Sequence, residues 1–260
     1  MNFPIPFSLD LLPAEVFVYL AVFSRVSAMM MMFPGFGERG IPARVKILIS
    51  VVVVFTITPV VRQHVPPMPV DVLPMLILIG TEVVIGIALG VLVRMTMGAL
   101  QVAGHIISFS IGLAFAQGFD PSQGTQSTLV GTILAIIAVT LVFTLDLHHL
   151  MLEAVVESYW VYSPGALPAV EGFFHNAVMT VAGSFVLALR MSAPFLVVGL
   201  VVYMGVGILS RLMPAVQIFF IVMPANIMIG IALLGFLIST MMMAFFTYFE
   251  AYVSQLLMGG

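Results

Sequence analysis

Apolar residues run along this chain in stretches much longer than the core of a soluble protein requires. Residues 129–145 carry no charged side chain, and residues 75–93 carry only Glu82. The runs at residues 177–209 and 215–249 are longer still, and Pro194 and Pro224 interrupt them. Because one membrane span takes about 20 apolar residues, these runs predict an all-α, integral-membrane-type protein with about six or seven helices. Hairpins of long, proline-kinked helices are expected.

Charged residues are too few for an ordinary water-facing surface. They make up 7% of the 260 residues, while hydrophobic residues make up 62%; soluble domains have about 25% charged residues. The chain is therefore predicted to lie in a membrane or to be enclosed by partner proteins. The net charge of -3, with no run of Lys or Arg, argues against a nucleic-acid partner.

The sequence lacks the motifs of an enzyme. No cysteine is present, which excludes thiol catalysis and thiolate metal sites. There is no GxSxG elbow and no P-loop lysine. Asp146, His149 and Glu153 are spaced to share one helix face, but they match no established metal-ligand pattern. We expect no catalytic residues, no metal and no cofactor.

Ionisable side chains inside apolar segments are the first candidate functional residues. Each costs at least about 2.5–3.5 kcal/mol to insert into a membrane, so each needs a partner or a water-filled cavity. Two interpretations stay open: buried ion pairs or interface contacts, and a proton relay, because histidine titrates near physiological pH. The candidates are Arg25, Glu82, Asp146, His148, His149 and Arg190.

Small residues form a second group of candidates. Gly86 and Gly90 make a GxxxG pair, and Gly98 and Gly104 continue the series. Glycines allow helix backbones to approach closely in membranes. They predict either close packing within this chain or contact with neighbouring subunits.

Residues 104–127 combine glycines and phenylalanines and then end in a turn at Asp120-Pro121. We expect helices at 75–93 and 95–116 leading into it. Further on, the aromatic group around Trp160 with Pro164-Gly165 predicts an interfacial loop. Charged loops obey the positive-inside rule only in part, so some segments are not expected to face lipid.

Two classes of function fit these features. In a channel or translocation component, the glycine- and phenylalanine-rich segment would obstruct a path between helices. In a secondary transporter, the helix breaks at Pro194 and Pro224 would form a solute site. Little besides Asn226 is polar near those breaks, and no repeat is visible, which favours the first class.

The order of several motifs resembles the FliR family of type III secretion export-gate proteins. The similarity covers nearly the whole chain and includes Arg25 with Pro34 and Pro42-Ala-Arg44, Glu82 with Gly86 and Gly90, Ala103-Gly104-His105, Gly112 to Asp120-Pro121, Asp146-Leu-His148-His149, Glu157-Ser158-Tyr159, Ser163-Pro164-Gly165 and Pro214 with Pro224. The resemblance implies a single export-gate domain over residues 1–260. Within it, about 1–175 would be FliP-like and about 176–260 FliQ-like.

The resemblance also implies partners and a location. One copy of such a chain would assemble with FliP and FliQ homologues, near FlhA- and FlhB-type proteins, and would pass unfolded protein substrates. The complex would contact lipid in the bacterial inner membrane at the flagellar basal body, with much of the chain above the bilayer plane. An injectisome export gate is the alternative within the same family.

By the same resemblance, part of residues 104–127 would plug the channel. Apolar bulk would fill the lumen, and glycines would let the segment move. The predicted plug residues are Phe109, Ile111, Gly112, Leu113, Phe115, Gln117, Gly118, Phe119, Asp120 and Pro121.

Overall fold

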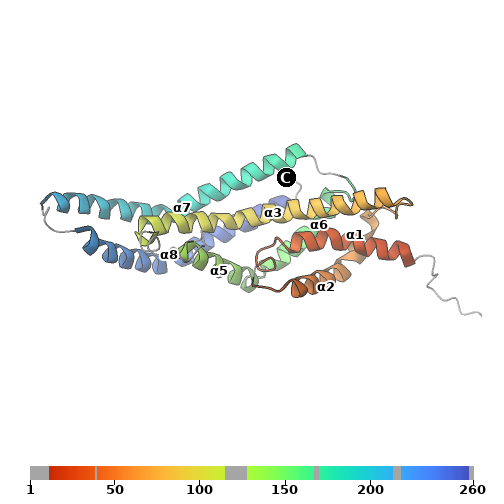
Figure 1. Cartoon of the computed structure of the whole chain (residues 1–260), viewed down its shortest axis with the longest axis horizontal. Helices are drawn as coiled ribbons and strands as arrows, with labels where there is room; N and C mark the ends of the chain where they lie inside the picture. The colour runs from red at the N-terminus through yellow and green to blue at the C-terminus, as the bar shows by residue number, and fades with distance from the viewer. Residues whose placement is uncertain (1–11, 39, 115–127, 167–169, 213–217, 258–260) are drawn as a thin grey trace, which may run out of the picture. The chain divides into compact units, whose positions relative to one another are not determined.

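The computed structural model describes residues 12–38, 40–114, 128–166, 170–212 and 218–257. Every regular element in them is helical, which confirms the all-α prediction (Figure 1). The elements are α1 Leu12–Met30, α2 Ala43–Val61, the 3-10 turn η2 Arg62–His64, α3 Val72–Ser110, α5 Leu129–Thr144, α6 Leu147–Val161, α7 Val170–Leu212 and α8 Ile218–Leu257.

Most of these helices have the length and composition of a membrane span. Within the described residues, five helices are long and apolar enough to cross a bilayer. The number rises to six if α5 and α6, which are bent by 78° at their junction, are counted as one broken span. The predicted membrane-type helical architecture is therefore present.

The described residues fall into two compact units. Unit 1 takes its residues from Met1–Arg94, Val142–Thr180 and Ala251–Gly260, and unit 2 from Met95–Leu141 and Val181–Glu250. These units are defined by contacts within the chain. The predicted FliP-like portion (about 1–175) and FliQ-like portion (about 176–260) are defined by likeness to partner subunits, so the two units do not test that division and it stays a prediction.

In unit 1, α1 packs against α2 and against the first half of α3. Phe17, Ala21 and Leu78 form a buried cluster between α1 and α3. Close approach of the two helices depends on Gly86, because a Cβ atom there would lie 2.5 Å from the backbone oxygen of Arg25. α6 contacts α2 as well.

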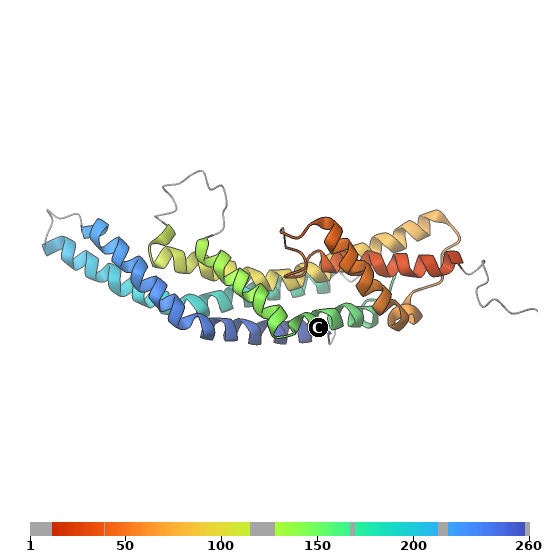
Figure 2. The same cartoon turned by 90° about the horizontal axis from the view of Figure 1, so that it is seen from below.

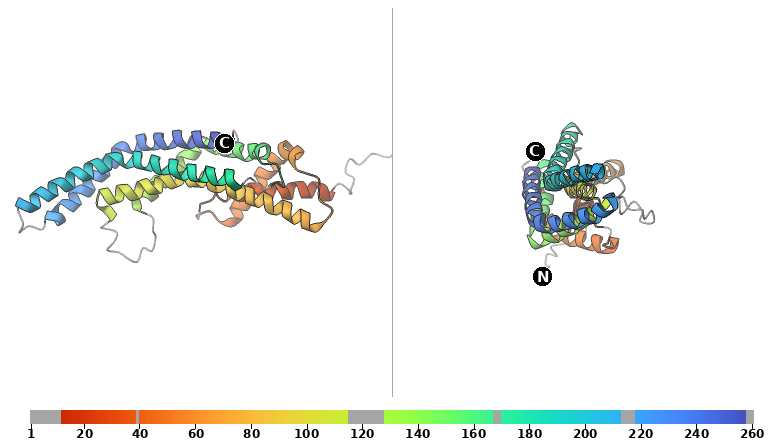
Figure 3. Two further views of the ribbon diagram at one scale, coloured as in Figure 1. Left: turned by 90° about the horizontal axis from the view of Figure 1, so that it is seen from above. Right: turned by 90° about the vertical axis from the view of Figure 1, so that its left-hand side faces the viewer.

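In unit 2, α7 and α8 run alongside each other, as Figures 2 and 3 show. They touch where Gly183 of α7 faces the ring of Tyr248 on α8, which leaves 2.6 Å between a Cβ atom at Gly183 and the Tyr248 hydroxyl oxygen. α7 also meets α3, because the Ser184 hydroxyl donates to the backbone oxygen of Met95 at 3.4 Å. The last turns of α3 and the start of α5 pack through Gly104 and Gly131.

Two expectations about the elements are wrong. α3 is one helix from Val72 to Ser110, not two helices meeting near Arg94. Nothing between residues 91 and 97 breaks a helix, and Arg94 is exposed on its surface. The aromatic residues around Trp160 are not a loop either: α6 extends to Val161 and includes Trp160. The turn at Ser163-Pro164-Gly165 follows α6 and is not helical, so the predicted loop begins after Trp160 rather than around it.

Candidate functional site

The predicted plug begins at the carboxyl end of α3, and only its first part is described. Phe109 is exposed, Ile111 is buried, Leu113 is half-buried, and Gly112 has φ +83°. A positive φ of this size is costly for residues other than glycine. The remaining predicted plug residues lie outside the described residues: Phe115, Gln117, Gly118, Phe119, Asp120 and Pro121.

The described end of α3 is enclosed by the other helices of unit 2. Ser110 is 5% exposed and Ile111 is 3% exposed. α8 contributes Asn226, whose side-chain amide donates to the Ser110 backbone oxygen at 3.3 Å. Sequence reasoning noted Asn226 only as an isolated polar residue. Its spacing from α3 in the sequence gave no signal of this contact.

A buried ion pair lies at the centre of unit 1. Arg25 of α1 and Glu82 of α3 are both 0% exposed. The Arg25 Nε donates to Glu82 Oε2 at 2.8 Å, and Nη2 donates to Oε1 at 3.0 Å. Such two-pronged, charge-assisted bonding is the strongest geometry available to this pair of residue types. The structure therefore brings together two of the predicted ionisable residues.

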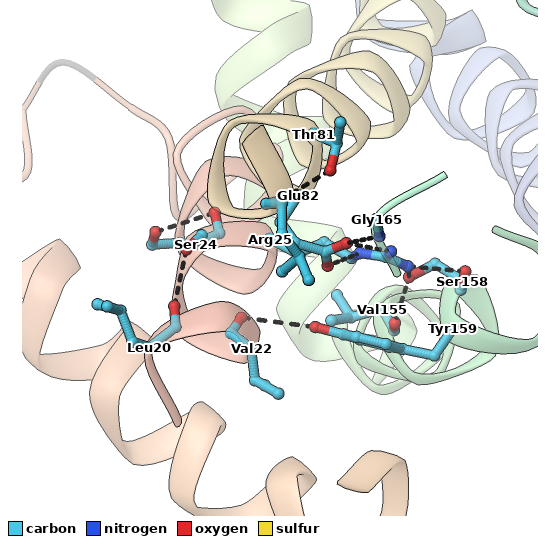
Figure 4. Close-up of polar contacts among 12 residues, drawn as sticks. Leu20, Val22, Ser24, Arg25, Thr81, Glu82, Val155, Ser158, Tyr159 and Gly165 are labelled. Carbon is cyan, nitrogen blue, oxygen red and sulfur yellow. Dashed lines mark hydrogen bonds and ion pairs between the residues drawn. The ribbon is translucent and has the colours of Figure 1, made fainter. Parts of the chain in front are cut away.

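Residues of α6 and of the turn after it complete the surroundings of this pair (Figure 4). Arg25 Nη1 donates to the Ser158 backbone oxygen at 2.9 Å, and the guanidinium carbon lies 4.1 Å from the centre of the Tyr159 ring. The backbone N–H of Gly165 donates to Glu82 Oε1 at 3.1 Å. Both charges are compensated by groups of the same chain, so this centre ties α1, α3 and α6 together.

A third predicted group lies where α5 and α6 meet. Asp146 has φ +58°, a left-handed conformation, and α6 begins directly after it. The ligand atoms of Asp146, His148 and His149 all lie within 4.8 Å of one another. This set could in principle hold a cation, but the amino end of a helix carries partial positive charge and disfavours one.

Most of the other predicted ionisable residues are not buried by the chain itself. Asp146 and His149 are exposed, His148 is intermediate, and Arg190 is exposed on α7. The Nδ1 atom of His148 is buried and has no hydrogen-bond partner. Of the six predicted ionisable residues, Arg25 and Glu82 alone are buried by the chain itself. A counter-charge or polar partner for Arg190 would have to come from outside the chain.

Three of the four predicted glycines face helices of the same chain. Gly86 and Gly90 of α3 lie against α1 and the turn that follows it, where a Cβ at Gly90 would come 3.1 Å from the Met29 backbone oxygen and 2.7 Å from the Met32 Cβ. Gly104 lies against the backbone of Gly131. Gly98 differs, because no atom lies within 4 Å of a Cβ built there. Close packing within the chain thus accounts for Gly86, Gly90 and Gly104 but not for Gly98.

Comparison with protein families gives one match over most of the chain. The family described as bacterial export proteins, family 1, matches residues 16–252. This range includes the ion pair, the α5–α6 junction and the end of α3.

Individual relatives agree with this match. The flagellar biosynthetic protein FliR of Caulobacter vibrioides is 38% identical over 225 residues, which cover 86% of this chain and 90% of the relative. FliR of Bacillus subtilis is 30% identical over 233 residues, covering 87% of this chain and 86% of the relative. The Yop proteins translocation protein T of Yersinia pestis is similar at 25% identity over 233 residues, covering 86% and 87%.

Proposed function

Because this chain belongs to the FliR family of bacterial export proteins, we propose that it is a core subunit of the flagellar type III protein export gate. The observation that carries this proposal is the family match over residues 16–252. Identity of 38% to a flagellar relative, against 25% to the Yersinia translocation protein, favours flagellar over injectisome use. The work of such a subunit is transport across a membrane, and it calls for no catalytic residue and no cofactor.

The proposed setting is a hetero-oligomer in the bacterial inner membrane at the flagellar basal body. One copy of this chain would join several FliP and FliQ homologues, next to FlhA- and FlhB-type proteins. Exposed apolar side chains on α7 and α8 support enclosure by partners or lipid: Val201 is 64% exposed, Met228 73% and Phe236 82%. Surfaces of this kind are rarely left to water. Much of the chain would lie above the bilayer plane.

In this assembly the segment after α3 would close the channel for unfolded protein substrates. Phe109 and Leu113, with Phe115 and Phe119, would supply apolar bulk that excludes water and ions until a substrate displaces it. Gly112 and Gly118 would permit the movement, and Asp120-Pro121 would mark its fixed end. Support comes from Gly112, which lies two residues after the end of α3 and has φ +83°.

Deletion of residues 111–118 tests the plug. We expect the assembled complex with this deletion to conduct ions in planar bilayers far more than the intact complex, because the apolar obstruction is gone. Recovery of the partner subunits with the shortened chain is the control that the assembly is still intact. Equal conductance of the two intact assemblies would contradict the plug.

Gly98 is the remaining candidate for contact with a neighbouring subunit. Its Cβ direction is open in this chain, unlike those of Gly86, Gly90 and Gly104. We therefore assign Gly98 to a partner interface and the other three glycines to packing within the subunit.

A further inference from the structure

The carboxyl end of α3 is held in place by α7 and α8 through a small set of contacts in unit 2. The central contact is the hydrogen bond from Asn226 Nδ2 to the Ser110 backbone oxygen, 3.3 Å long. Asn226 is 4% exposed and Ser110 is 5% exposed. Water therefore cannot easily replace either group.

A helix end of this kind needs such a donor. The last four backbone carbonyls of an α-helix have no partner within the helix, and a buried carbonyl without a partner is costly. α3 ends at Ser110, so its carbonyl belongs to this group. Between residues 221 and 237 of α8, Asn226 is the one side chain that can donate a hydrogen bond. Asn226 thus places a hydrogen-bond donor on an otherwise apolar stretch of α8, opposite the Ser110 carbonyl.

Two glycines allow α7 and α8 to come close enough for this contact. A Cβ atom at Gly199 of α7 would lie 3.0 Å from the Ser110 backbone oxygen, the same atom that Asn226 binds. A Cβ atom at Gly230 of α8 would overlap the side chain of Ile111. Ser110 and Ile111 are therefore fitted against both helices, and larger residues at either glycine would push them away.

Gly112, directly after these residues, is not packed tightly against α7 and α8. A Cβ atom built on it would be 3.8 Å from both Asn226 Nδ2 and the Tyr203 hydroxyl oxygen, so space is not limiting. A cavity of about 20 Å³ lies beside it, lined by Gly112, Val202, Tyr203, Val206, Val222, Met223 and Asn226. That volume is little more than the ~10–15 Å³ that one water needs. The chain can thus change direction at Gly112, while Ser110 and Ile111 cannot easily follow.

From this geometry we infer that Asn226 is a positioning residue for the plug. It fixes the last turn of α3, and so sets the point and direction from which the plug starts. The inference rests on the plug role proposed above.

Replacement of Asn226 by leucine tests the anchor in the complex purified with its partners. Leucine keeps the branched shape of the side chain and removes the donor. The backbone N–H groups of Ile111 and Gly112 bond to Ile107 and Phe109 oxygens, so their hydrogen exchange reports opening of this last turn. We expect exchange of these two amides to become about fivefold faster in N226L, the loss expected from one hydrogen bond.

Ser192→Ala is the matched control. Ser192 is also buried in unit 2, but its hydroxyl bonds only within α7, to the Ala188 oxygen at 2.8 Å. S192A should leave the exchange at Ile111 and Gly112 unchanged. Gly199→Ala is a second test variant, because it displaces the same Ser110 oxygen without touching Asn226, and it should also speed the exchange.

Unchanged exchange at Ile111 and Gly112 in either N226L or G199A would overturn the anchor. Conductance of the same complexes in bilayers tests the plug itself. Raised exchange with raised conductance supports both the anchor and the plug. Raised exchange with unchanged conductance keeps Asn226 as the anchor of α3 and contradicts the proposed plug, so the two failures are distinguishable.

Discussion

Arg25 and Glu82 show how a chain with few charges uses them. Each charge alone would be costly in an apolar environment, whereas the pair is closed on itself by the bonds to Ser158 and Gly165. Ionisable residues inside apolar runs could be recognised from the sequence. Which two would pair could not, because residues 25 and 82 lie on separate helices and spacing within one helix carries no information about another.

Removal of one member of this pair should be strongly destabilising. Glu82→Ala leaves the Arg25 guanidinium buried without its counter-charge, at a cost of about 3–5 kcal/mol in the free energy of unfolding. Thermal unfolding of the purified protein, followed by Trp160 fluorescence, provides the measurement. Glu15→Ala is the control, since the Glu15–Arg62 pair is exposed and worth about 0–1 kcal/mol. Equal effects of the two variants would contradict the structural role of the buried pair.

Asp146 is the other residue whose conformation makes a distinct prediction. At φ +58° a glycine is accommodated without strain, while a β-branched side chain is not. Asp146→Gly should therefore retain the stability of the native chain, and Asp146→Val should lower it by about 1–2 kcal/mol. The unfolding midpoints of the two variants give the answer. Identical midpoints would mean that the left-handed turn does not set the junction of α5 and α6.

Among the helices, α3 departs most from expectation. Hydropathy suggested two spans of ordinary length, because Arg94 looked like the end of one. A single charge does not end a helix, however, and a residue on the exposed side of α3 can carry it. The true end at Ser110 is set by Gly112 with its positive φ and by the capping bond from Asn226. The sequence shows the glycine at position 112. It does not show the bond from Asn226, because that residue belongs to a helix far along the chain.

The glycines of α3 give a matched pair for testing close packing within the chain. Gly86→Ala would place a methyl group 2.5 Å from the Arg25 backbone oxygen and 2.8 Å from the Ala28 Cβ. Overpacking of this kind costs about 1–3 kcal/mol. Gly98→Ala meets no atom within 4 Å and should gain up to about 1 kcal/mol of helix propensity.

Thermal unfolding of the chain purified alone should therefore move in opposite directions for G86A and G98A. A loss of stability of the same size in both would show that Gly86 is not a packing contact. If Gly98 lies at the proposed partner interface, less of the partner subunits should be recovered with the G98A chain than with the native chain.

At the scale of the whole protein, the helices leave much of their apolar surface uncovered. In an apolar 18-residue window within Ile221–Gln255 of α8, only 17% of the residues are buried within the chain. Composition alone predicted that such a chain needs lipid or partners. It could not say which, because lipid tails and partner helices present similar apolar surfaces. The partners proposed here come from the resemblance to the FliR family, and the contacts within each unit do not identify them.

The export-gate assignment is tested most directly by co-expression with FliP and FliQ homologues, followed by native mass spectrometry of the purified complex. We predict one stable assembly that contains a single copy of this chain with several copies of each partner. Absence of any such assembly, with neither partner recovered although both are co-expressed with the chain, would contradict the assignment.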